Sequence, residues 1–224
     1  MHEHSESGAT RESWPALVVH AVVDPAIVST LRLELPTLLE RRLRRMHSVE
    51  AQARTLTGYW LLLQACRLRG LSHPPLSAIE ISAAGRPAWP DGPAFNISHS
   101  QHRAACIVAP DGLLGLDVEK RRPLRLTRFK RFLTHAEWRR CEEDPEAFFE
   151  AWTTREAVVK ATGRVGLSRI ARVVPAPGGA DLDGQWLHLR HFELDGGYTL
   201  CVASDRVLPG LQVQSLDASA TPRK

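Results

Sequence analysis

Cysteine is scarce in this chain, and its positions fit neither a disulfide framework nor a zinc site. No Cys-x-x-Cys pair occurs, and no histidine stands at zinc-ligand spacing from a cysteine. The four cysteines are Cys66, Cys106, Cys141 and Cys201. This pattern predicts reduced, partly buried thiols, which is what a cytoplasmic protein usually carries.

Long apolar runs are missing as well. Stretches such as Leu17-Val18-Val19 are far shorter than a membrane span requires. The polar residues 1–8 lack the apolar region of a secretory signal. We therefore expect a cytoplasmic protein without a membrane partner.

Three motifs of phosphate and acyl chemistry are absent too. Neither Gly-x-Gly-x-x-Gly nor the P-loop pattern Gly-x-x-x-x-Gly-Lys-Ser/Thr occurs, and the Gly-x-Ser-x-Gly elbow of serine hydrolases is missing. The net charge of +4 favours anionic partners. Nucleic-acid binding without sequence preference would usually show a denser basic stripe, so no nucleic-acid partner is expected.

The composition is that of an ordinary globular protein, with 43% hydrophobic and 24% charged residues. A length of 224 residues allows one sizeable core or two small lobes that share one. Helical spacing covers residues 25–45, which Pro36 can split, and residues 48–69, where Ser48 is a cap and Gly70 a stop. Strand patterns cover residues 16–23, 79–82, 94–98, 104–108 and 113–119. Asp111-Gly112 predicts a hairpin between the last two strands.

The second half repeats this mixture of helices and strands. Helical pattern returns over residues 126–132, a capping box opens a helix at Thr134, and Asp144-Pro145 starts another helix. From residue 170 onward the chain is β-rich, with strands 186–194 and 198–203 joined around Gly196-Gly197. This order, about a centre near Gly112, is compatible with two similar α+β lobes.

Two carboxylates stand one residue apart in the strand that precedes Lys120. The strand period of two places Asp117 and Glu119 on one side and Leu116 and Val118 on the other. Such a pair on a strand is usually a solvated face. Here Gly115 precedes the pair and a basic run follows it, which marks a strand end of the kind where sites are often built.

A second charged pair, Glu156 and Lys160, lies one helical turn apart. On a surface this spacing is simply a favourable ion pair, worth about 0.2–0.5 kcal/mol. Phe148, Trp152 and Val159 fall on one helical stripe, however, and the charged pair lies at its margin, near packed protein. Three acids and a lysine that converge from a strand and a helix would hold a hard divalent cation against a phosphate.

Groups that bind anions occur elsewhere in the chain. The strand that contains Ser98-His99-Ser100 presents hydroxyls, an imidazole and loop amides together, although lone histidines are more often structural. Basic groups that can reach an anion are Arg41, Arg42, Arg44, Arg45, Arg54 beside Thr55, and Arg86. At least half of these arginines are expected to lie on solvated helix faces.

Taken in order, these segments resemble the 4′-phosphopantetheinyl transferase superfamily, in its Sfp-type (surfactin-type) branch. The matching segments are Arg54-Thr55-Leu56-x-Gly58, Gly85-Arg86-Pro87, Phe95-Asn96-Ile97-Ser98-His99-Ser100, Gly115-Leu116-Asp117-Val118-Glu119-Lys120 and Trp152-Thr153-x-Arg155-Glu156-Ala157-x-x-Lys160-Ala161-x-Gly163. The resemblance covers residues 41–167. Each motif is weak alone, but the ordered set is specific.

The resemblance implies an α+β fold of two pseudo-symmetric lobes with the active site between them. The expected division is a disordered N-terminus over residues 1–13, lobes over residues 14–112 and 113–215, and a flexible tail over residues 216–224. Because one chain supplies both lobes, a monomer is expected.

The resemblance also implies an activity. The enzyme would move the 4′-phosphopantetheine arm of coenzyme A to a serine of an apo acyl or peptidyl carrier protein, leaving adenosine 3′,5′-bisphosphate. By similarity, Asp117, Glu119 and Glu156 bind Mg²⁺ or Mn²⁺ and Lys160 contacts the pyrophosphate, with Asp117, Glu156 and Lys160 as the catalytic residues. The base is either Glu156 or a metal-bound water. An acidic carrier would dock on the basic surface.

Coenzyme A contacts are implied for a further set of side chains, chiefly with its phosphates. They are Thr55, Arg86, Ser98, His99 and Lys160. The arginines at 41, 42, 44 and 45 are less definite candidates for the same ligand. Three positions depart from the family pattern: Gln101 stands where a glycine is usual, and Arg86 and Arg155 stand where lysine is common.

Two other functions use the same residues. A metal-dependent phosphohydrolase acting on coenzyme A or a nucleotide would need the acids but no carrier protein. A non-catalytic nucleic-acid-binding module would use the arginine helix alone.

Overall fold

The computed structural model describes residues 16–31, 33–164 and 166–218. The N-terminal segment 1–13 that was expected to be disordered, and most of the expected C-terminal tail, lie outside these ranges. None of the helices in the described part of the chain combines the length and the apolarity that a membrane crossing requires.

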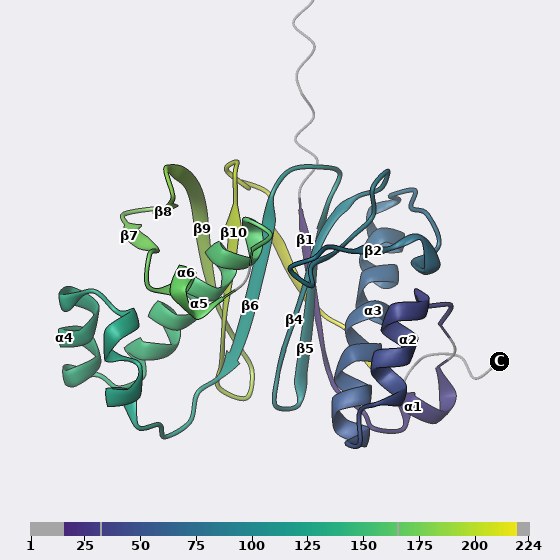
Figure 1. Ribbon diagram of the computed structural model, residues 1–224, viewed down its shortest axis with the longest axis horizontal. Helices are drawn as coiled ribbons and strands as arrows, with labels where there is room; N and C mark the ends of the chain where they lie inside the picture. Colours follow the sequence, from purple (N-terminus) through teal and green to yellow (C-terminus); the bar gives the residue numbers. More distant parts are fainter. Residues whose placement is uncertain (1–15, 32, 165, 219–224) are drawn as a thin grey trace, which may run out of the picture.

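The described residues form two sheets that lie edge to edge, with helices on the outer side of each (Figure 1). The four-stranded sheet has the order β11-β1-β5-β4, and its strands are β1 (Leu17–Val22), β4 (Ala94–Ser100), β5 (Arg103–Ala109) and β11 (Gln212–Ser215). The five-stranded sheet has the order β6-β10-β9-β8-β7, and its strands are β6 (Leu114–Lys120), β7 (Val174–Ala176), β8 (Gly179–Leu182), β9 (Gln185–Leu194) and β10 (Tyr198–Ser204). A small hairpin pairs β2 (Glu80–Ile81) with β3 (Pro87–Ala88). This mixture confirms the α+β class.

Helices of each half cover the sheet beside them. On the first sheet they are α1 (Ile27–Thr30), α2 (Thr37–Arg44), α3 (Val49–Arg69) and the 3₁₀ turn η1 (Leu76–Ala78). On the second they are α4 (His135–Glu143), α5 (Ala147–Ala161), α6 (Leu167–Ile170) and the 3₁₀ turns η2 (Leu126–Arg128) and η3 (Lys130–Phe132). The pseudo-symmetric two-lobe arrangement and the boundary at residue 112 stay predictions. Strand β11, near the end of the expected second lobe, pairs in parallel with β1 of the first sheet.

Two local predictions were wrong. Asp111-Gly112 does not close a hairpin, because β5 pairs with β1 and β4 whereas β6 pairs with β10. The turn, with Gly112 at φ 94°, carries the chain from one sheet to the other. Residues 126–132 form the 3₁₀ turns η2 and η3 in place of an α-helix, because Leu126 and Phe129 pack inward at a spacing of three.

The long helices begin and end where their sequence signals predict. The Ser48 hydroxyl accepts the Ala51 amide at 3.2 Å to cap α3, and Gly70 ends that helix at φ 61°. Thr134 and Glu137 form the complete capping box of α4. Pro36 directly precedes α2, so the predicted helical stretch 25–45 is split into α1 and α2.

The two sheets meet where β4 lies along β6, and side chains replace the usual backbone ladder there. Polar side chains at alternate positions of β4 accept the backbone N–H groups of β6. These bonds run from Leu116 N to Asn96 Oδ1 at 3.1 Å, from Val118 N to Ser98 Oγ at 3.3 Å and from Lys120 N to Ser100 Oγ at 3.2 Å. We call this contact the β4–β6 seam. It satisfies edge amides that would otherwise be buried without a partner.

Helix α5 crosses β6 at a point where the strand has no side chain. A Cβ atom on Gly115 would stand 1.8 Å from the Ala157 carbonyl oxygen and 2.7 Å from the Ala161 nitrogen. Both neighbours are backbone atoms of α5, so they can yield only if the whole helix moves. Gly115 therefore sets how closely α5, with Glu156 and Lys160 on it, approaches Asp117.

We predict that Gly115→Ala destabilises the protein by about 1–3 kcal/mol or prevents folding, because overpacked cores relax poorly. Urea unfolding followed by circular dichroism measures the change. Gly58→Ala is the matched control, since its Cβ meets only the Ile97 side chain, at 2.6 Å, and alanine favours the helix there. Equal stability of the two variants would contradict the close approach at Gly115.

Candidate active site

Asp117 is the centre of a polar cluster at the β4–β6 seam. Its Oδ1 atom accepts Lys160 Nζ at 2.6 Å and the Ser98 hydroxyl at 2.9 Å. Lys160 Nζ also donates to Ser98 Oγ at 3.0 Å. The residue is only 4% exposed, and its second oxygen, Oδ2, is buried without a hydrogen-bond partner among the described residues. One carboxylate oxygen is thus left ready for a further ligand.

Glu119 follows on the same side of β6. Its Oε2 accepts the Ser100 hydroxyl at 2.6 Å and lies 3.6 Å from Nη1 of Arg122. Burial, with the nearby Asp117 charge second, raises the pKa of Glu119 above its ordinary value. The alternation predicted from the sequence is confirmed for these two acids, and both are held by serines of β4.

Glu156 approaches the same cluster from α5. Burial raises its pKa, Asp117 and Glu119 raise it further, and Lys160 opposes them. Asp117 is therefore close enough to both glutamates to disfavour their ionisation. Nearby carboxylates of this kind bind a cation well once one is present, because the cation removes their repulsion.

The three acids do not form a closed cage for an ion. Across residues 16–31, 33–164 and 166–218, no three His, Cys, Asp or Glu side chains are grouped tightly enough to hold an ion alone. The unpartnered Asp117 oxygen and the raised pKa values of Glu119 and Glu156 nevertheless fit a hard divalent cation. Mg²⁺ commonly takes one or two carboxylates and completes its shell with water and phosphate oxygens. The metal role of Asp117, Glu119 and Glu156 stays a prediction that this cluster suits.

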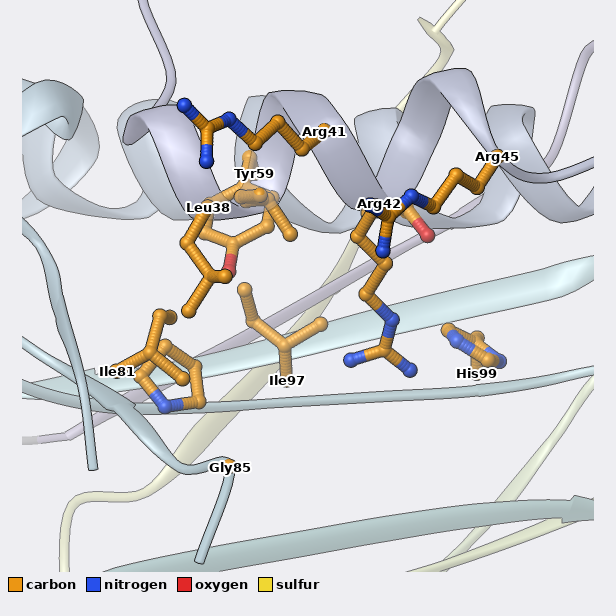
Figure 2. Close-up of a pocket in the computed structure, with 12 residues that line it drawn as sticks. Leu38, Arg41, Arg42, Arg45, Tyr59, Ile81, Gly85, Ile97 and His99 are labelled. Atoms are coloured by element: carbon orange, nitrogen blue, oxygen red, sulfur yellow. The ribbon is translucent and has the colours of Figure 1, made fainter. Parts of the chain in front are cut away.

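A pocket of about 570 Å³ opens beside the acids, between α2, α3, β4 and the β2–β3 hairpin. Its lining is Leu38, Leu39, Arg41, Arg42, Arg45, Thr55, Tyr59, Ile81, Gly85, Pro87, Ile97 and His99. Figure 2 shows the arginines of α2 above it and the Arg42 guanidinium extending toward His99. One part of the pocket is apolar and the other basic, which suits a ligand with a planar group and phosphates.

His99 connects this pocket to the acid cluster. The ring is exposed, yet the pocket walls desolvate it enough to lower its pKa, and the charges of Arg54 and Lys160 lower it further. Asp117 acts on the same ring in the opposite direction. His99 therefore lies within electrostatic reach of both regions, and Ser98 next to it binds Asp117 and Lys160 directly.

The structure separates the arginine candidates. Arg41, Arg42 and Arg45 line the pocket with Thr55, whereas Arg44 points away and pairs with Glu40 at 3.6 Å. Arg86 does not line the pocket either. Its Nη1 and Nη2 atoms donate to two backbone carbonyls of the second half.

The other two departures from the family pattern have structural explanations. Arg155 is 1% exposed and uses its planar fork fully, donating Nη1 and Nη2 to Glu137 at 2.5 and 2.6 Å and Nε to the Phe132 carbonyl at 2.6 Å. It anchors α5 to α4, and lysine has no such fork. Gln101 takes the left-handed conformation that glycine favours, with φ 50° in the β4–β5 turn.

Sequence reasoning missed the apolar part of the pocket and the direction of Arg86. Leu38, Tyr59 and Ile97 read as ordinary core positions, and Leu38 is exposed at 60%. The alternation of Asn96, Ser98 and Ser100 along β4 was the available signal for the seam, since three buried polar side chains on one side of a strand need partners.

The raised pKa of Glu156 predicts a change in stability with pH. Because this carboxyl binds its proton more tightly in the folded state, its ionisation opposes folding at pH 7, and that cost is absent well below the ordinary value of 4.5. We expect Glu156→Gln, in EDTA at pH 7, to melt at a higher temperature than the wild-type protein, and to lose this gain as the pH falls toward 4.

Differential scanning fluorimetry from pH 4 to pH 8 measures the effect. Glu150→Gln is the control on the same helix, because the exposed Glu150 pairs with Arg140 at 3.4 Å and is expected to gain nothing. A lower melting temperature for Glu156→Gln at pH 7 would show that this carboxylate is not in an unfavourable site.

The comparisons with known proteins converge on the same region. A model of the 4′-phosphopantetheinyl transferase superfamily matches residues 113–176, which include β6 and α5. The 4′-phosphopantetheinyl transferase Sfp of Bacillus subtilis is 30% identical over 132 residues, covering 56% of this chain and 58% of that protein. The 4′-phosphopantetheinyl transferase ffp of Bacillus subtilis is 25% identical over 177 residues, covering 73% of this chain and 79% of that protein.

A third relative, the 4′-phosphopantetheinyl transferase AcpT of Salmonella typhimurium, is 34% identical over 113 residues, covering 46% of this chain and 58% of that protein. The chain thus spans somewhat more than half the length of Sfp and of AcpT. The matched region contains Asp117, Glu119, Glu156 and Lys160, the residues that the structure brings together. The chain is thus similar to 4′-phosphopantetheinyl transferases over the region that carries these residues.

Proposed function

We propose that this protein transfers the 4′-phosphopantetheine arm of coenzyme A to a serine of an apo acyl or peptidyl carrier protein, with Mg²⁺ or Mn²⁺ as cofactor. The observation that carries the proposal is the junction of two regions. His99 lines the basic pocket and lies within electrostatic reach of Lys160 and Asp117, while its neighbour Ser98 binds both of these residues. A diphosphate that crosses this junction would have its nucleotide end among arginines and its reacting phosphorus beside Lys160. The names of the relatives support the same transfer.

The ligand is held by this chain's own groups at both ends. Arg41, Arg42 and Arg45 bind phosphate of the adenosine part, while Leu38 and Ile97 offer an apolar surface to its base. Lys160 moves from Asp117 toward the pyrophosphate, or bridges both, and balances charge that develops on the leaving group. A bound divalent cation supplies further neutralisation of that charge at Asp117, Glu119 and Glu156.

The bond changes follow from this placement. The serine hydroxyl oxygen of the carrier forms a bond to the β-phosphorus of coenzyme A, and the bond from that phosphorus to the bridging oxygen breaks. Adenosine 3′,5′-bisphosphate leaves, and the hydroxyl proton passes to a base. Glu156 is our candidate for this base, because it lies in the same cluster as Asp117 and Lys160.

We propose that two separate clusters of arginines bind the two substrates, one coenzyme A and the other the carrier protein. Arg41, Arg42 and Arg45 line the pocket, which leaves a second basic group beyond β6 for the acidic carrier. Arg122, Arg125, Arg128 and Arg131 recur every third residue through η2 and η3, and all four are exposed. Arg128 and Arg131 lie within these 3₁₀ turns, whose geometry places residues three apart on one side, while Leu126 and Phe129 pack inward. Arg122 and Arg125 precede η2, and we propose that the four side chains form one basic ridge. The ridge begins at Arg122, whose guanidinium contacts Glu119 of the acid cluster.

One chain supplies every part of this site, so we propose a monomer as the active unit. The Sfp-type branch is proposed on the match to Sfp. The two sheets with their helices would then serve as two lobes with the site at the β4–β6 seam between them.

The transfer is tested by a mass increase of one phosphopantetheine on an apo carrier protein with coenzyme A and Mg²⁺. We expect Asp117→Asn and Glu156→Gln to lower the rate by about 100-fold or more, since each removes a charged group at the reacting centre. Arg190→Gln, at an exposed position of β9, is the control and should keep the rate. Failure to modify fatty-acid, polyketide and peptidyl carriers, with release of adenosine 3′,5′-bisphosphate from coenzyme A alone, would favour a phosphohydrolase instead.

Docking on the basic ridge makes a separate kinetic prediction. The double variant Arg125→Glu/Arg128→Glu should raise the KM for the carrier about tenfold or more, because two attractive charges become repulsive. The KM for coenzyme A should stay unchanged, and the wild-type KM for the carrier should rise with salt. Arg190→Glu is the matched charge reversal away from the ridge. An equal rise in the KM for the carrier in the double variant and in Arg190→Glu would contradict docking at the ridge.

A further inference from the structure

The β2–β3 hairpin forms one wall of the pocket and is a slender element. It contributes Ile81, Gly85 and Pro87 to the lining, and its two strands pair over only two residues each. Its turn is closed by bonds from Ser82 N to the Arg86 carbonyl at 2.9 Å and from Arg86 N to Ser82 Oγ at 3.1 Å. An element with so few internal contacts needs an outside attachment to hold a pocket wall in place.

Arg86 provides such an attachment to the other half of the protein. Its Nη1 atom donates to the Ala161 carbonyl at 3.0 Å, and its Nη2 atom donates to the Leu114 carbonyl at 3.5 Å. Ala161 is the last residue of α5 and directly follows Lys160. Carbonyls in this last turn lack helical partners and lie at the negative end of the helix dipole, so a cation is favourable there. Both ends of the guanidinium fork are thus used for backbone.

The chain leaves room for this contact at Gly163. This glycine has φ 75°, and a Cβ atom on it would stand 3.2 Å from Arg86 Nη1 and 3.6 Å from Arg86 Cδ. Any side chain at position 163 would therefore press on the guanidinium that reaches Ala161. Arg86 Nε is buried and has no hydrogen-bond partner among the described residues, so this part of the half-buried side chain is covered by protein.

We propose that Arg86 is a positioning residue that couples the pocket wall to α5, and not a direct ligand of coenzyme A. By holding the hairpin against the last turn of α5, it fixes the distance between the nucleotide pocket and Lys160. Both must contact the same diphosphate, so a loose hairpin would misplace one end of the ligand against the other. The identity of that ligand rests on the proposed transferase function, whereas the coupling itself rests on the contacts of Arg86.

The test uses Gly163→Asn, which keeps the charge of Arg86 but crowds its side chain. Asparagine tolerates a positive φ, and Gly70→Asn is the matched control, because Gly70 has φ 61° at the end of α3 with nothing within 4 Å of a Cβ. We expect Gly163→Asn and Arg86→Met each to raise the KM for coenzyme A about threefold to tenfold and to lower kcat, as coupling residues do. The KM for the carrier should stay the same, which separates positioning from general loss of folded protein.

The double variant distinguishes coupling from ligand contact. If Arg86 acts through Ala161, Gly163→Asn/Arg86→Met is no worse than Arg86→Met alone. A Gly163→Asn enzyme with wild-type kinetics, beside an Arg86→Met enzyme that fails to bind coenzyme A, would overturn the proposal in favour of a direct contact. Effects that multiply in the double variant would overturn it too.

Binding of adenosine 3′,5′-bisphosphate, followed by calorimetry, gives a readout that needs no carrier. Wild-type protein and Gly70→Asn should bind it equally, and Gly163→Asn and Arg86→Met should bind it about threefold to tenfold more weakly. This order of affinities supports the coupling whether or not the protein modifies a carrier. If it modifies none, the proposed transferase function is wrong but the coupling is not. Equal affinity in all four proteins overturns the coupling.

Discussion

The β4–β6 seam is the contact on which the rest of the structure depends. Two sheet edges meet there without a backbone ladder, and serine and asparagine side chains of β4 take the place of the missing strand. The Ser98 hydroxyl takes part in both the seam and the acid cluster. It donates to Asp117 and accepts from Val118 N and Lys160 Nζ, which uses its one donor and both acceptor positions. The atom that joins the sheets is therefore also the atom that places the site.

The same arrangement lowers the folding stability of the protein when no ligand is bound. Asp117 is buried with one oxygen unpartnered, and the pKa values of Glu119 and Glu156 are raised by burial and by the acids around them. A hydrophobic or neutral set of side chains would pack there at lower cost. Lys160 offsets part of the repulsion by its contact with Asp117. Under the proposed function, a cation and a phosphate bound at these residues would offset that cost, as in many functional sites.

Much of the site could be predicted from the sequence, because helix and strand periods fix which side chains share a face. Asp117 with Glu119, and Glu156 with Lys160, required only those periods. The partner of each element could not be read in this way. The segment 104–119 reads as a hairpin, yet its strands join different sheets. Strand β6 pairs with β10, and its other edge bonds to polar side chains of β4 that lie 20 positions earlier in the sequence. Arg86 reads as an anion ligand, although it donates to the Ala161 carbonyl at the end of α5 and to the Leu114 carbonyl of β6.

Two glycines set the spacing that periodicity leaves open. Gly115 lets α5 approach β6 closely enough for Lys160 to reach Asp117, and Gly163 leaves room for Arg86 at the end of the same helix. One contact positions α5 against the acids, and the other positions the pocket wall against α5. Both contacts therefore set the distance between the two ends of a ligand that would span the pocket and the acids. The two glycines thus determine the geometry of the site as much as the charged side chains do. A side chain added at Gly115 could not be accommodated by a rotamer change, because it would meet backbone atoms of α5.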